Sequence, residues 1–277
     1  MQALNHLIQS LLWEPTVDKS IDSLPVKTNA LGFDPWGFSP RQSKLYYSLA
    51  YRIYQYFRPE IFGIENIPAG RVLVVPNHSG QLPFDGLVIA VACLLHATPP
   101  RLVRPMVERW FPTLPVVNTA FSRSGAVLGD PINCRNLLQA DNAILVFPEG
   151  ARGSGKTWDH RYQLVEFGRG FMRLALATNT SIVPVAVVGS EEQAPAFNCR
   201  PLARLLGVPA FPIMPFPPFF PALPLPSRYH IHFGEPLCFV GHPDDDDEQI
   251  EQLVKHVRLT IESMLRVGLK SRRSVFF

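Results

Sequence analysis

The sequence is poor in charged residues and in cysteine. Charged residues make up 18% of the 277 residues and hydrophobic residues 47%, which indicates either a large core or a surface that contacts lipid. The net charge is only +3 and no dense Lys/Arg run with interleaved aromatic residues occurs, so no nucleic-acid partner is predicted. The four cysteines lie far apart, which excludes a disulfide framework and a zinc-finger pattern. We expect reduced thiols, no metal and no bound cofactor.

Long hydrophobic runs are also missing. No apolar run reaches the roughly 18 to 20 residues that a bilayer-spanning helix needs. The closest is Gly86–Leu95, which is better explained as a buried helix. The N-terminus lacks the basic region and the cleavage site of a signal peptide. We therefore expect neither secretion nor a transmembrane helix, and contact with a membrane from one face stays open.

Short apolar runs alternate with helical segments from Ile61 onward. The predicted strands are Ile61–Ile64, Val72–Val75, Ile144–Phe147 and Ile182–Val188, and the predicted helices are Pro83–His96, Pro131–Ala140 and Gly168–Ala177. This alternation is typical of βαβ units. It predicts an α/β fold with a mostly parallel central sheet flanked by helices, in a domain that spans residues 59–277.

The N-terminal residues 1–58 are predicted to form a helical or membrane-contact segment. Residues 1–13 carry an apolar stripe that either docks on the body of the protein or lies on a membrane surface. Residues 14–40 are expected to be an irregular connector. Five aromatic residues recur near helical spacing between Ser43 and Phe57, which favours a packed helix, with anchoring at a membrane interface as the alternative.

Two further segments lie after the alternating region. Residues 193–234 are apolar and rich in proline, and their centre, residues 211–226, cannot be a helix or a central strand because proline lacks an amide donor. This segment covers the core or contacts lipid, and both interpretations stay open. A C-terminal helix is predicted over residues 244–267, with the acidic run Asp244–Asp247 complementing the helix dipole at its start.

Two chemically active side chains follow the strand in the stretch VLVVPNHSGQLPFD, residues 72–85. His78 can accept and release a proton near neutral pH, and a neighbouring carboxylate would orient its ring. Gly80 and Pro83 would turn the chain so that Asp85 meets His78, with Pro83 in the first turn of the next helix. Taken alone, such a pair is more often structural than catalytic.

A second stretch, ILVFPEGARG at residues 144–153, ends its strand in Glu149, Gly150 and Arg152. The planar guanidinium of Arg152 suits a phosphate, and Gly150 lets backbone amides approach a ligand. Arg123, in the segment FSRSG, is a further cation beside a glycine. Because the carboxyl ends of parallel strands share one edge, we expect these groups to face His78 across an active site. The combination predicts base chemistry next to an anionic group.

Four segments, NHSGQLPFD, FSRSG, FPEGARG and IVPV, resemble in order the four sequence blocks of the glycerolipid acyltransferase superfamily, which includes the bacterial lysophosphatidate acyltransferases. The resemblance runs from Ile61 to Gly189, with a weaker similarity in RYHIHFGEPL. It implies a His78 base assisted by Asp85. It implies binding of the acceptor or its phosphate by Arg123, Glu149, Gly150 and Arg152. The implied partners are acyl-CoA or acyl carrier protein, a lipid acceptor and the cytoplasmic side of a membrane, with peripheral or monotopic attachment.

The spacing of the first block departs from the family pattern. The family usually has four residues between its His and Asp, whereas six separate His78 from Asp85 here. This form resembles a divergent branch related to the monoacylglycerol and diacylglycerol acyltransferase-like group. We therefore predict O-acyl transfer from a thioester to a glycerolipid hydroxyl, with a phosphate-bearing acceptor such as lysophosphatidate. A neutral alcohol is the alternative acceptor. Amides near Gly80 or the amide of Gly150 are candidates for stabilising the oxyanion.

A competing motif overlaps the third block. Residues 150–157, GARGSGKT, match the phosphate-binding loop pattern G-x-x-x-x-G-K-[ST], and a strand precedes them. A P-loop nucleotide-binding protein is therefore the alternative from another class. That pattern requires a helix beginning at Lys156, and Gly168 and Gly170 interrupt any long helix there. We expect Lys156 to lie in a solvated loop, with assistance to anion binding left open.

Overall fold

The computed structural model describes residues 13–78, 84–109, 117–154, 156–198, 212–213 and 224–276. A seven-stranded sheet forms its centre. Its strands are β1 (Glu60–Phe62), β2 (Val72–Pro76), β3 (Val103–Val107), β4 (Val127–Leu128), β5 (Ala143–Leu145), β6 (Ile182–Val188) and β9 (His230–Phe233). A separate two-stranded antiparallel ladder pairs β7 (Phe197–Asn198) with β8 (Pro212–Ile213).

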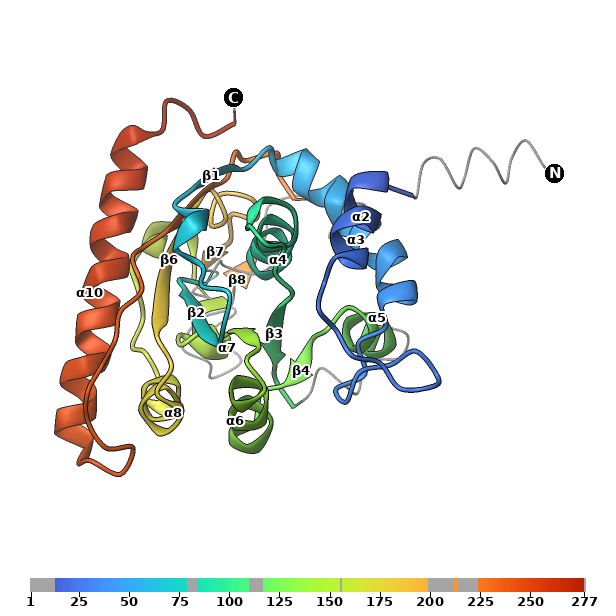
Figure 1. The fold of residues 1–277 in the computed structure, drawn as a ribbon. Helices are drawn as coiled ribbons and strands as arrows, with labels where there is room; N and C mark the ends of the chain where they lie inside the picture. Colours follow the sequence, from blue (N-terminus) through green and yellow to red (C-terminus); the bar gives the residue numbers. More distant parts are fainter. Residues whose placement is uncertain are drawn as a thin grey trace.

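The strand order in the large sheet is β1-β9-β6-β2-β5-β3-β4 (Figure 1). The five strands from β6 to β4 are parallel to their neighbours, β9 is antiparallel to β6, and β1 is parallel to β9. The predicted α/β fold with a mostly parallel sheet is therefore confirmed. In this order β2 lies between β6 and β5, so the chain segments that follow these three strands meet at one edge.

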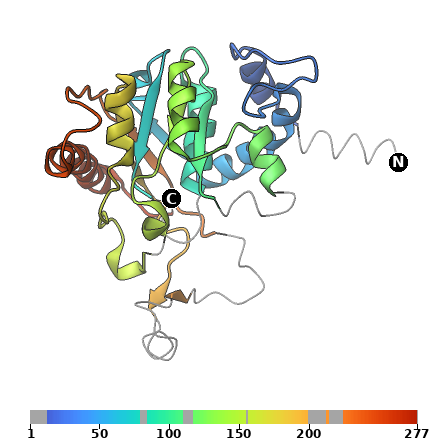
Figure 2. The ribbon, with the colours of Figure 1, turned by 90° about the horizontal axis from the view of Figure 1, so that it is seen from below.

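Helices cover both faces of the sheet (Figures 1 and 2). The helices are α2 (Pro15–Asp22), α3 (Pro40–Phe57), α4 (Phe84–His96), α5 (Val117–Arg123), α6 (Pro131–Gln139), α7 (Gly150–Ser154), α8 (Gly170–Thr178) and α10 (Asp247–Ser271), with 3-10 turns η1 (Ile64–Asn66) and η3 (Trp158–His160). Within the described part of the chain, no helix combines the length and the apolar character that crossing a membrane requires.

The side chains of β2 alternate between the two faces of the sheet, and each face has its own hydrophobic core covered by helices. Val72 and Val74 join the cluster that α2, α3 and α4 cover, while Leu73 and Val75 join the cluster under α6, α8 and α10. Successive strand residues point to opposite faces, so a strand that is buried on both faces must be apolar at every position. All five residues of β2 and all seven of β6 are buried, which makes these two strands the centre of the core.

The prediction of an irregular connector over residues 14–40 was wrong, because this segment contains α2. Pro15 stands in its first turn, where a missing amide donor costs nothing. Val17 and Ile21, four residues apart, are both buried and pack into the same core as α3 and α4. The apolar spacing was present in the sequence, but it extends over only two helical turns.

At one end of the large sheet the two strands β3 and β4 were missed, and β7, β8 and β9 were not among the predicted strands either. β3 reads VRPMV, and its arginine and proline hide the strand pattern. β4 has only two residues. The sheet therefore extends further beyond β5 than the sequence indicated, and the cavity described below lies against this extension.

Several predicted bounds were also wrong by a few residues. β1 ends at Phe62 because Gly63 adopts a φ of +71° and turns the chain. β5 ends at Leu145, so Phe147 lies in the following turn. α8 begins and ends later than predicted, at Gly170 and Thr178. α10 begins after Asp246, whose carboxylate accepts the amide of Gln249 at 2.8 Å, and it continues to Ser271.

Some predictions fall outside the described residues. These are the stripe over residues 1–12, the turn residues Gly80 and Pro83, and all but five residues of the proline-rich centre, residues 211–226. Cys93 and Cys134 are buried free thiols and Cys238 is an exposed one, as predicted, while Cys199 lies outside the described chain.

A buried ion pair joins the N-terminal segment to the sheet. Arg104 on β3 pairs with Asp34, and both side chains are 2% exposed. The Arg104 Nε also donates to Asn142 Oδ1 at 2.9 Å. The second Asp34 oxygen accepts the amides of Trp36 and Phe38 at 2.9 and 2.8 Å. Asp34 therefore closes the turn over residues 34–38, and Arg104 fixes this turn to β3.

The substitution Arg104→Met should lower the free energy of unfolding by about 3–5 kcal/mol, because it leaves the Asp34 carboxylate buried without its counter-charge. Urea denaturation followed by circular dichroism measures the change. Arg71→Met is the matched control, since Arg71 and Asp141 form a 3.1 Å pair with side chains that are 39% and 66% exposed. The control should cost at most about 1 kcal/mol. Equal losses in the two variants would contradict a special role of the buried pair.

Candidate active site

His78 follows the end of β2, two residues beyond Pro76. Its ring is 12% exposed, and its Nδ1 lies 2.8 Å from Asp85 Oδ2 at the start of α4. The Asp85 side chain is fully buried, and its Oδ1 accepts the amide of Gly86 at 2.8 Å. The structure thus brings Asp85 to His78 across the six intervening residues, as the sequence predicts. The ring nitrogen Nε2 is left as the one that can meet a substrate.

The imidazole of His78 also packs on Phe147. The two ring centroids lie 4.2 Å apart, with 30° between the planes. Phe147 follows β5, so a residue on a neighbouring strand end fixes the face of the ring. Gly86 allows this packing, because a Cβ at that position would meet the Phe147 ring at 3.3 Å.

Opposing effects act on the pKa of His78. Burial by itself lowers the pKa, but the charge of Asp85, the hydrogen bond to it and the charge of Glu149 raise it, while Lys156 lowers it. The net effect is a pKa above the ordinary 6.5. A His78 that must be neutral to act as a base would therefore gain activity as the pH rises through this raised pKa.

Asn77 fixes the end of β2 to β6. Its Oδ1 accepts the amide of Val187 at 2.7 Å, and its Nδ2 donates to the Val187 carbonyl at 3.1 Å. The side-chain amide thus continues the pairing between the strands after Pro76, which has no amide donor of its own. Because Asn77 is fully buried, this pairing is protected from water. It therefore fixes the backbone position of His78, the next residue.

Glu149 was predicted to bind the substrate, and its position in the structure gives it a different contact with the site. Its Oε1 accepts the main-chain amide of His78 at 2.8 Å, and its Oε2 accepts the amide of Val165 at 3.0 Å. Lys156 Nζ lies 3.1 Å from Oε2. With its side chain fully buried and both oxygens engaged, Glu149 holds the backbone of His78.

Helix α7 packs directly against the histidine through Gly153. A Cβ added at Gly153 would lie 2.9 Å from the Cβ of His78 and 2.7 Å from that of Glu149, so only glycine fits without a shift. Gly150, at the start of α7, has a φ of +56°, and its amide donates to the Phe147 carbonyl at 3.1 Å. This amide closes the turn after β5 and is not free for an oxyanion. The other candidate, near Gly80, lies outside the described residues.

Arg152 is placed between these two glycines of α7, and its side chain is 66% exposed. Its nearest ion-pair partner is Glu166, whose carboxylate is 3.6 Å away and 74% exposed. A pair this exposed adds little stability and leaves the guanidinium accessible to a ligand. Because Arg152 directly precedes the glycine that touches His78, its long side chain starts beside the histidine.

The expectation of a solvated Lys156 was wrong. Its side chain is 4% exposed, and its Nζ lies 3.1 Å from both Glu149 Oε2 and Glu191 Oε1. Glu191 follows β6, the strand beside β2, and its Oε2 accepts the amide of Tyr162 at 2.9 Å. Burial raises the pKa of Glu191 to about 7; Lys156 lowers this pKa and the charge of Glu149 raises it. Sequence reasoning missed Glu191, since no motif links residues 35 positions apart.

The phosphate-loop interpretation is not compatible with this geometry. The helix that follows Gly150 ends at Ser154, and Thr157 is followed only by the 3-10 turn η3. No helix therefore begins at Lys156 to present amides to a phosphate. The ammonium that would bind the phosphate is held between two buried carboxylates.

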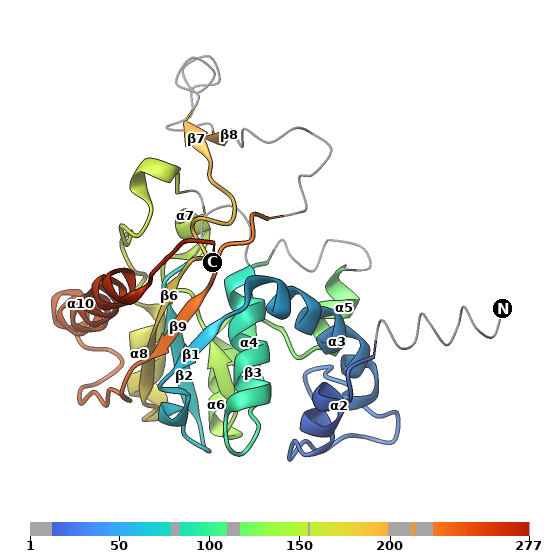
Figure 3. The ribbon, with the colours of Figure 1, turned by 90° about the horizontal axis from the view of Figure 1, so that it is seen from above.

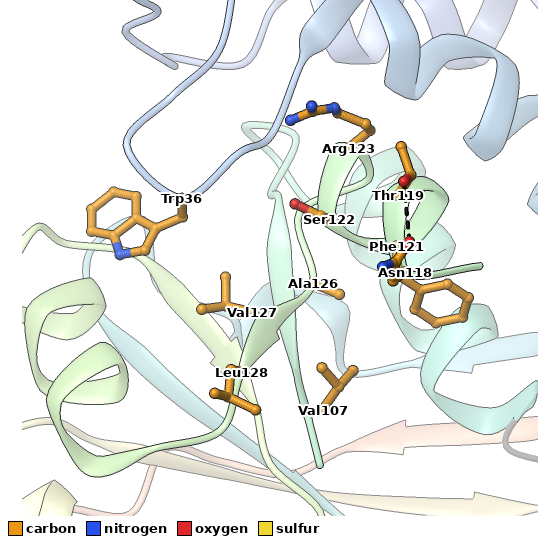
Figure 4. A pocket seen from close by; sticks show the side chains of 10 residues that line it. All are labelled: Trp36, Val107, Asn118, Thr119, Phe121, Ser122, Arg123, Ala126, Val127 and Leu128. Atoms are coloured by element: carbon orange, nitrogen blue, oxygen red, sulfur yellow. Dashed lines mark hydrogen bonds between the residues drawn. The ribbon is translucent and has the colours of Figure 1, made fainter. Parts of the chain in front are cut away.

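A cavity of about 360 Å³ lies at the carboxyl ends of β3 and β4 (Figure 4). It is lined by Trp36, Val107, Asn118, Thr119, Phe121, Ser122, Arg123, Ala126, Val127 and Leu128. Figure 4 shows Arg123 and Ser122 at one end and Val107 and Leu128 at the other, so the lining is polar at one end and apolar at the other. β3 is separated from β2 only by β5, which puts the cavity about 10 Å along the edge from the strand that carries His78.

Arg123 reaches this cavity from the end of α5. Its Nη1 donates to the Gly37 carbonyl at 3.2 Å, and its Cζ lies 4.1 Å from the centroid of the Phe33 ring. The guanidinium thus stacks on an aromatic face while most of its donors stay available. The structure places Arg123 at this cavity and Glu149 against the backbone of His78, while Gly150 and Arg152 lie in the short helix α7 that contacts His78 through Gly153. Within the described residues, no three His, Cys, Asp or Glu side chains cluster as a metal site.

The chain is similar to known proteins over most of its length. A protein-family model described as Acyltransferase matches residues 58–188. An uncharacterized protein of Mycobacterium leprae is 39% identical over 289 residues, which cover 96% of this chain and 79% of that protein. Uncharacterized proteins of Mycobacterium bovis and Mycobacterium tuberculosis are each 39% identical over 261 residues, which cover 90% of this chain and 73% of each relative.

The fold is similar to that of solved structures. One of them is the crystal structure of the 1-acyl-sn-glycerophosphate (LPA) acyltransferase PlsC from Thermotoga maritima, with a TM-score of 0.55 and 19% sequence identity. The match covers 84% of this chain and 81% of that chain. The chain belongs to one family with these mycobacterial relatives, and its residues 58–188 match the Acyltransferase family. All four sequence blocks lie within these residues, which confirms the resemblance to acyltransferases that they indicate. The divergent branch stays a prediction.

The substitution Asp85→Asn should move the pH dependence of acyl transfer. A His78 base is active when neutral, so kcat/KM of the wild type should rise with pH through a pKa above 6.5. Without the Asp85 charge, only Glu149 still raises the pKa of His78, while burial and Lys156 lower it. The pKa should therefore fall, and the rising limb of kcat/KM should shift to lower pH. The plateau should fall by about 10²–10⁴-fold. Rates from about pH 5 to 9 measure both changes. A limb that stays in place would contradict the coupling between Asp85 and His78.

Proposed function

We propose that the protein transfers a fatty acyl group from an acyl thioester to a hydroxyl group of a glycerolipid, with His78 as general base and Asp85 as its orienting partner. The observation that carries the proposal is the 2.8 Å contact between His78 Nδ1 and the buried Asp85, at the strand edge of an acyltransferase domain. A neutral imidazole with one nitrogen fixed by a carboxylate is the arrangement that activates a hydroxyl nucleophile.

In the proposed reaction, Nε2 of His78 accepts the proton of the acceptor hydroxyl while that oxygen attacks the thioester carbonyl. Asp85 stabilises the imidazolium that forms. The tetrahedral intermediate then collapses, the carbon–sulfur bond breaks, and the thiolate takes the proton from His78. The products are an ester and a free thiol. No acyl-enzyme is needed, because the acceptor itself is the nucleophile.

The favoured acceptor carries a phosphate, as lysophosphatidate does. Two guanidiniums support this choice: Arg152 is exposed and precedes the glycine that contacts His78, and Arg123 stands at the polar end of the cavity. The fold resembles that of an enzyme named for 1-acyl-sn-glycerophosphate, which favours the same class of acceptor. The apolar end of the cavity, with Val107 and Leu128, suits part of an acyl chain.

The donor in this proposal is acyl-CoA or acyl carrier protein, and the enzyme works on the cytoplasmic side of a membrane. A lipid acceptor that resides in a bilayer requires the enzyme to reach the membrane surface. The proline-rich and N-terminal apolar segments remain the candidates for this contact, together with the alternative that they only pack on the domain.

Release of free thiol from a long-chain acyl-CoA tests the proposal. The wild type is offered glycerol phosphate, lysophosphatidate, diacylglycerol or a long-chain alcohol, and one of these should accelerate thiol release and yield its ester. His78→Ala should reduce turnover to near the uncatalysed level while the circular dichroism spectrum stays unchanged. Turnover retained in His78→Ala would remove this residue from the mechanism. Bound acyl chains without thiol release for any alcohol would instead indicate a lipid carrier.

Arg152→Ala should distinguish the two classes of acceptor. Loss of a charge-assisted contact should lower kcat/KM for lysophosphatidate by about 10- to 100-fold and change the rate with diacylglycerol little. Arg135→Ala is the matched control, because Arg135 is an exposed arginine of α6, a helix on the opposite face of the sheet from α4. Equal losses for both acceptors would indicate a structural role of Arg152. A wild type that prefers diacylglycerol would favour the neutral-alcohol alternative.

A further inference from the structure

The chain after α10 reaches the strand edge on which His78 lies. Figure 3 shows α7 and the chain after α10 at the same end of the strands. Arg272, the first residue after α10, extends its guanidinium to Glu192 Oε1 at 2.5 Å. The side chains are 13% and 1% exposed, so this is a largely buried pair that joins residues 80 positions apart.

Glu192 is connected to the carboxylate beside it through Tyr162. The hydroxyl of Tyr162 donates to Glu192 Oε2 and accepts the amide of Gly189 at 2.7 Å. The main-chain amide of the same tyrosine donates to Glu191 Oε2 at 2.9 Å. Tyr162 therefore ties both carboxylates that follow β6 to one residue, and it contacts Arg272 as well, whose Cζ lies 5.9 Å from its ring centroid.

Glu191 continues the connection to the histidine. Lys156 bridges Glu191 and Glu149, and Glu149 accepts the main-chain amide of His78. The sequence of contacts is therefore Arg272, Glu192, Tyr162, Glu191, Lys156, Glu149 and His78. Each carboxylate in it is at most 2% exposed, so water cannot replace a lost partner.

The balance of charge makes each cation of this buried network important. Three carboxyl groups (Glu149, Glu191 and Glu192) share two cations, Lys156 and Arg272, and burial raises the pKa of Glu191 to about 7, so this group takes up a proton most readily when a cation is lost. Removing Arg272 would leave one ammonium for three buried carboxylates. Such an excess is relieved only if a carboxylate binds a proton or if the segments move apart and admit water. Either response would loosen Glu149, the acceptor that holds the amide of His78.

We propose that Arg272 is a positioning residue for His78, acting through the buried network that ends at Glu149. The segment after the C-terminal helix is thereby part of the catalytic apparatus although it contacts neither substrate nor the reacting atoms. This inference rests on the proposed function of His78 as the base. It also assigns Lys156 a role in holding the histidine and none in contacting the substrate.

Kinetics of Arg272→Ala test the proposal, with Arg273→Ala as the matched control because Arg273 is the next residue and is exposed. Arg272→Ala should lower kcat by about 10- to 100-fold with little change in KM, since a displaced base hinders chemistry more than binding. A displaced His78 also loses part of its contact with Asp85. The groups that face His78 are Asp85, Glu149 and Lys156, and a weaker Asp85 contact should move the rising limb of kcat/KM to lower pH.

Arg272→Lys keeps the charge but not the planar guanidinium over the Tyr162 ring, so it should restore part of kcat, clearly above that of Arg272→Ala. If Arg272→Ala does not fold, Tyr162→Phe tests the same network, because it removes only the hydroxyl between Glu192 and Gly189. This variant should also lower kcat and move the rising limb of kcat/KM to lower pH. His78→Ala, assayed in parallel, separates this proposal from the proposed function, because turnover retained there would refute the base itself.

Three results would overturn the role of Arg272. One is a kcat of Arg272→Ala equal to that of Arg273→Ala. If the melting temperature of Arg272→Ala falls while kcat stays the same, Arg272 only stabilises the packing of α10. A second is a lower kcat with an unmoved pH limb, because the effect would then lie elsewhere than at His78. The third is a failure of Arg272→Lys to restore activity, because the charge would then not be what matters.

Discussion

The buried carboxylate of Glu149 is the constraint on which the geometry of the site depends. A charged group with no exposed surface is stable only if donors replace the water that it has lost, and otherwise costs several kcal/mol. Three chain segments supply these donors: the turn after β2 through the amide of His78, the loop before α8 through the amide of Val165, and Lys156. None of the three can move without leaving this carboxylate unsatisfied. The position of the histidine is thus coupled to segments that follow different strands.

Two carboxylates act on His78 in different ways. Asp85 contacts the ring, so it determines the orientation and the protonation of the imidazole. Glu149 contacts the main chain, so it determines where the residue lies. Asn77 adds a third restraint through its pairing with Val187. Since the oxygens of Glu149 are already engaged, the exposed cation Arg152 is the group of this block that is free to meet a ligand. The block FPEGARG therefore combines a buried residue that holds the backbone of the proposed base with an exposed arginine that is accessible to an anion.

The sequence could predict the parts of the fold and the site that depend on local pattern. The apolar runs of β2 and β6 indicate strands buried on both faces, and the pair His78 and Asp85 is separated by a single loop, so its contact follows from the strand-to-helix connection. The pairs Lys156–Glu191 and Arg272–Glu192 could not be predicted, because they depend on β6 lying beside β2 and on where α10 ends. Hydrophobic periodicity specifies which residues are buried, but it does not specify which buried charges meet. For the same reason the polar pattern of β3, with Arg104 buried against Asp34, concealed a strand.

Lys156 shows how the surroundings of a residue decide between two functions that its sequence pattern permits. The segment GARGSGKT satisfies the phosphate-loop pattern, in which a lysine at a helix start neutralises a phosphate. In this fold the counter-charge comes instead from Glu149 and Glu191, and the second of these stands outside the motif, after the next central strand. An ammonium that already compensates two buried carboxylates can bind an anion only if those carboxylates are left without a partner, which costs more than a surface contact returns. One distant glutamate therefore decides what this motif does, and the lysine supports the proposed base, His78, from within the core.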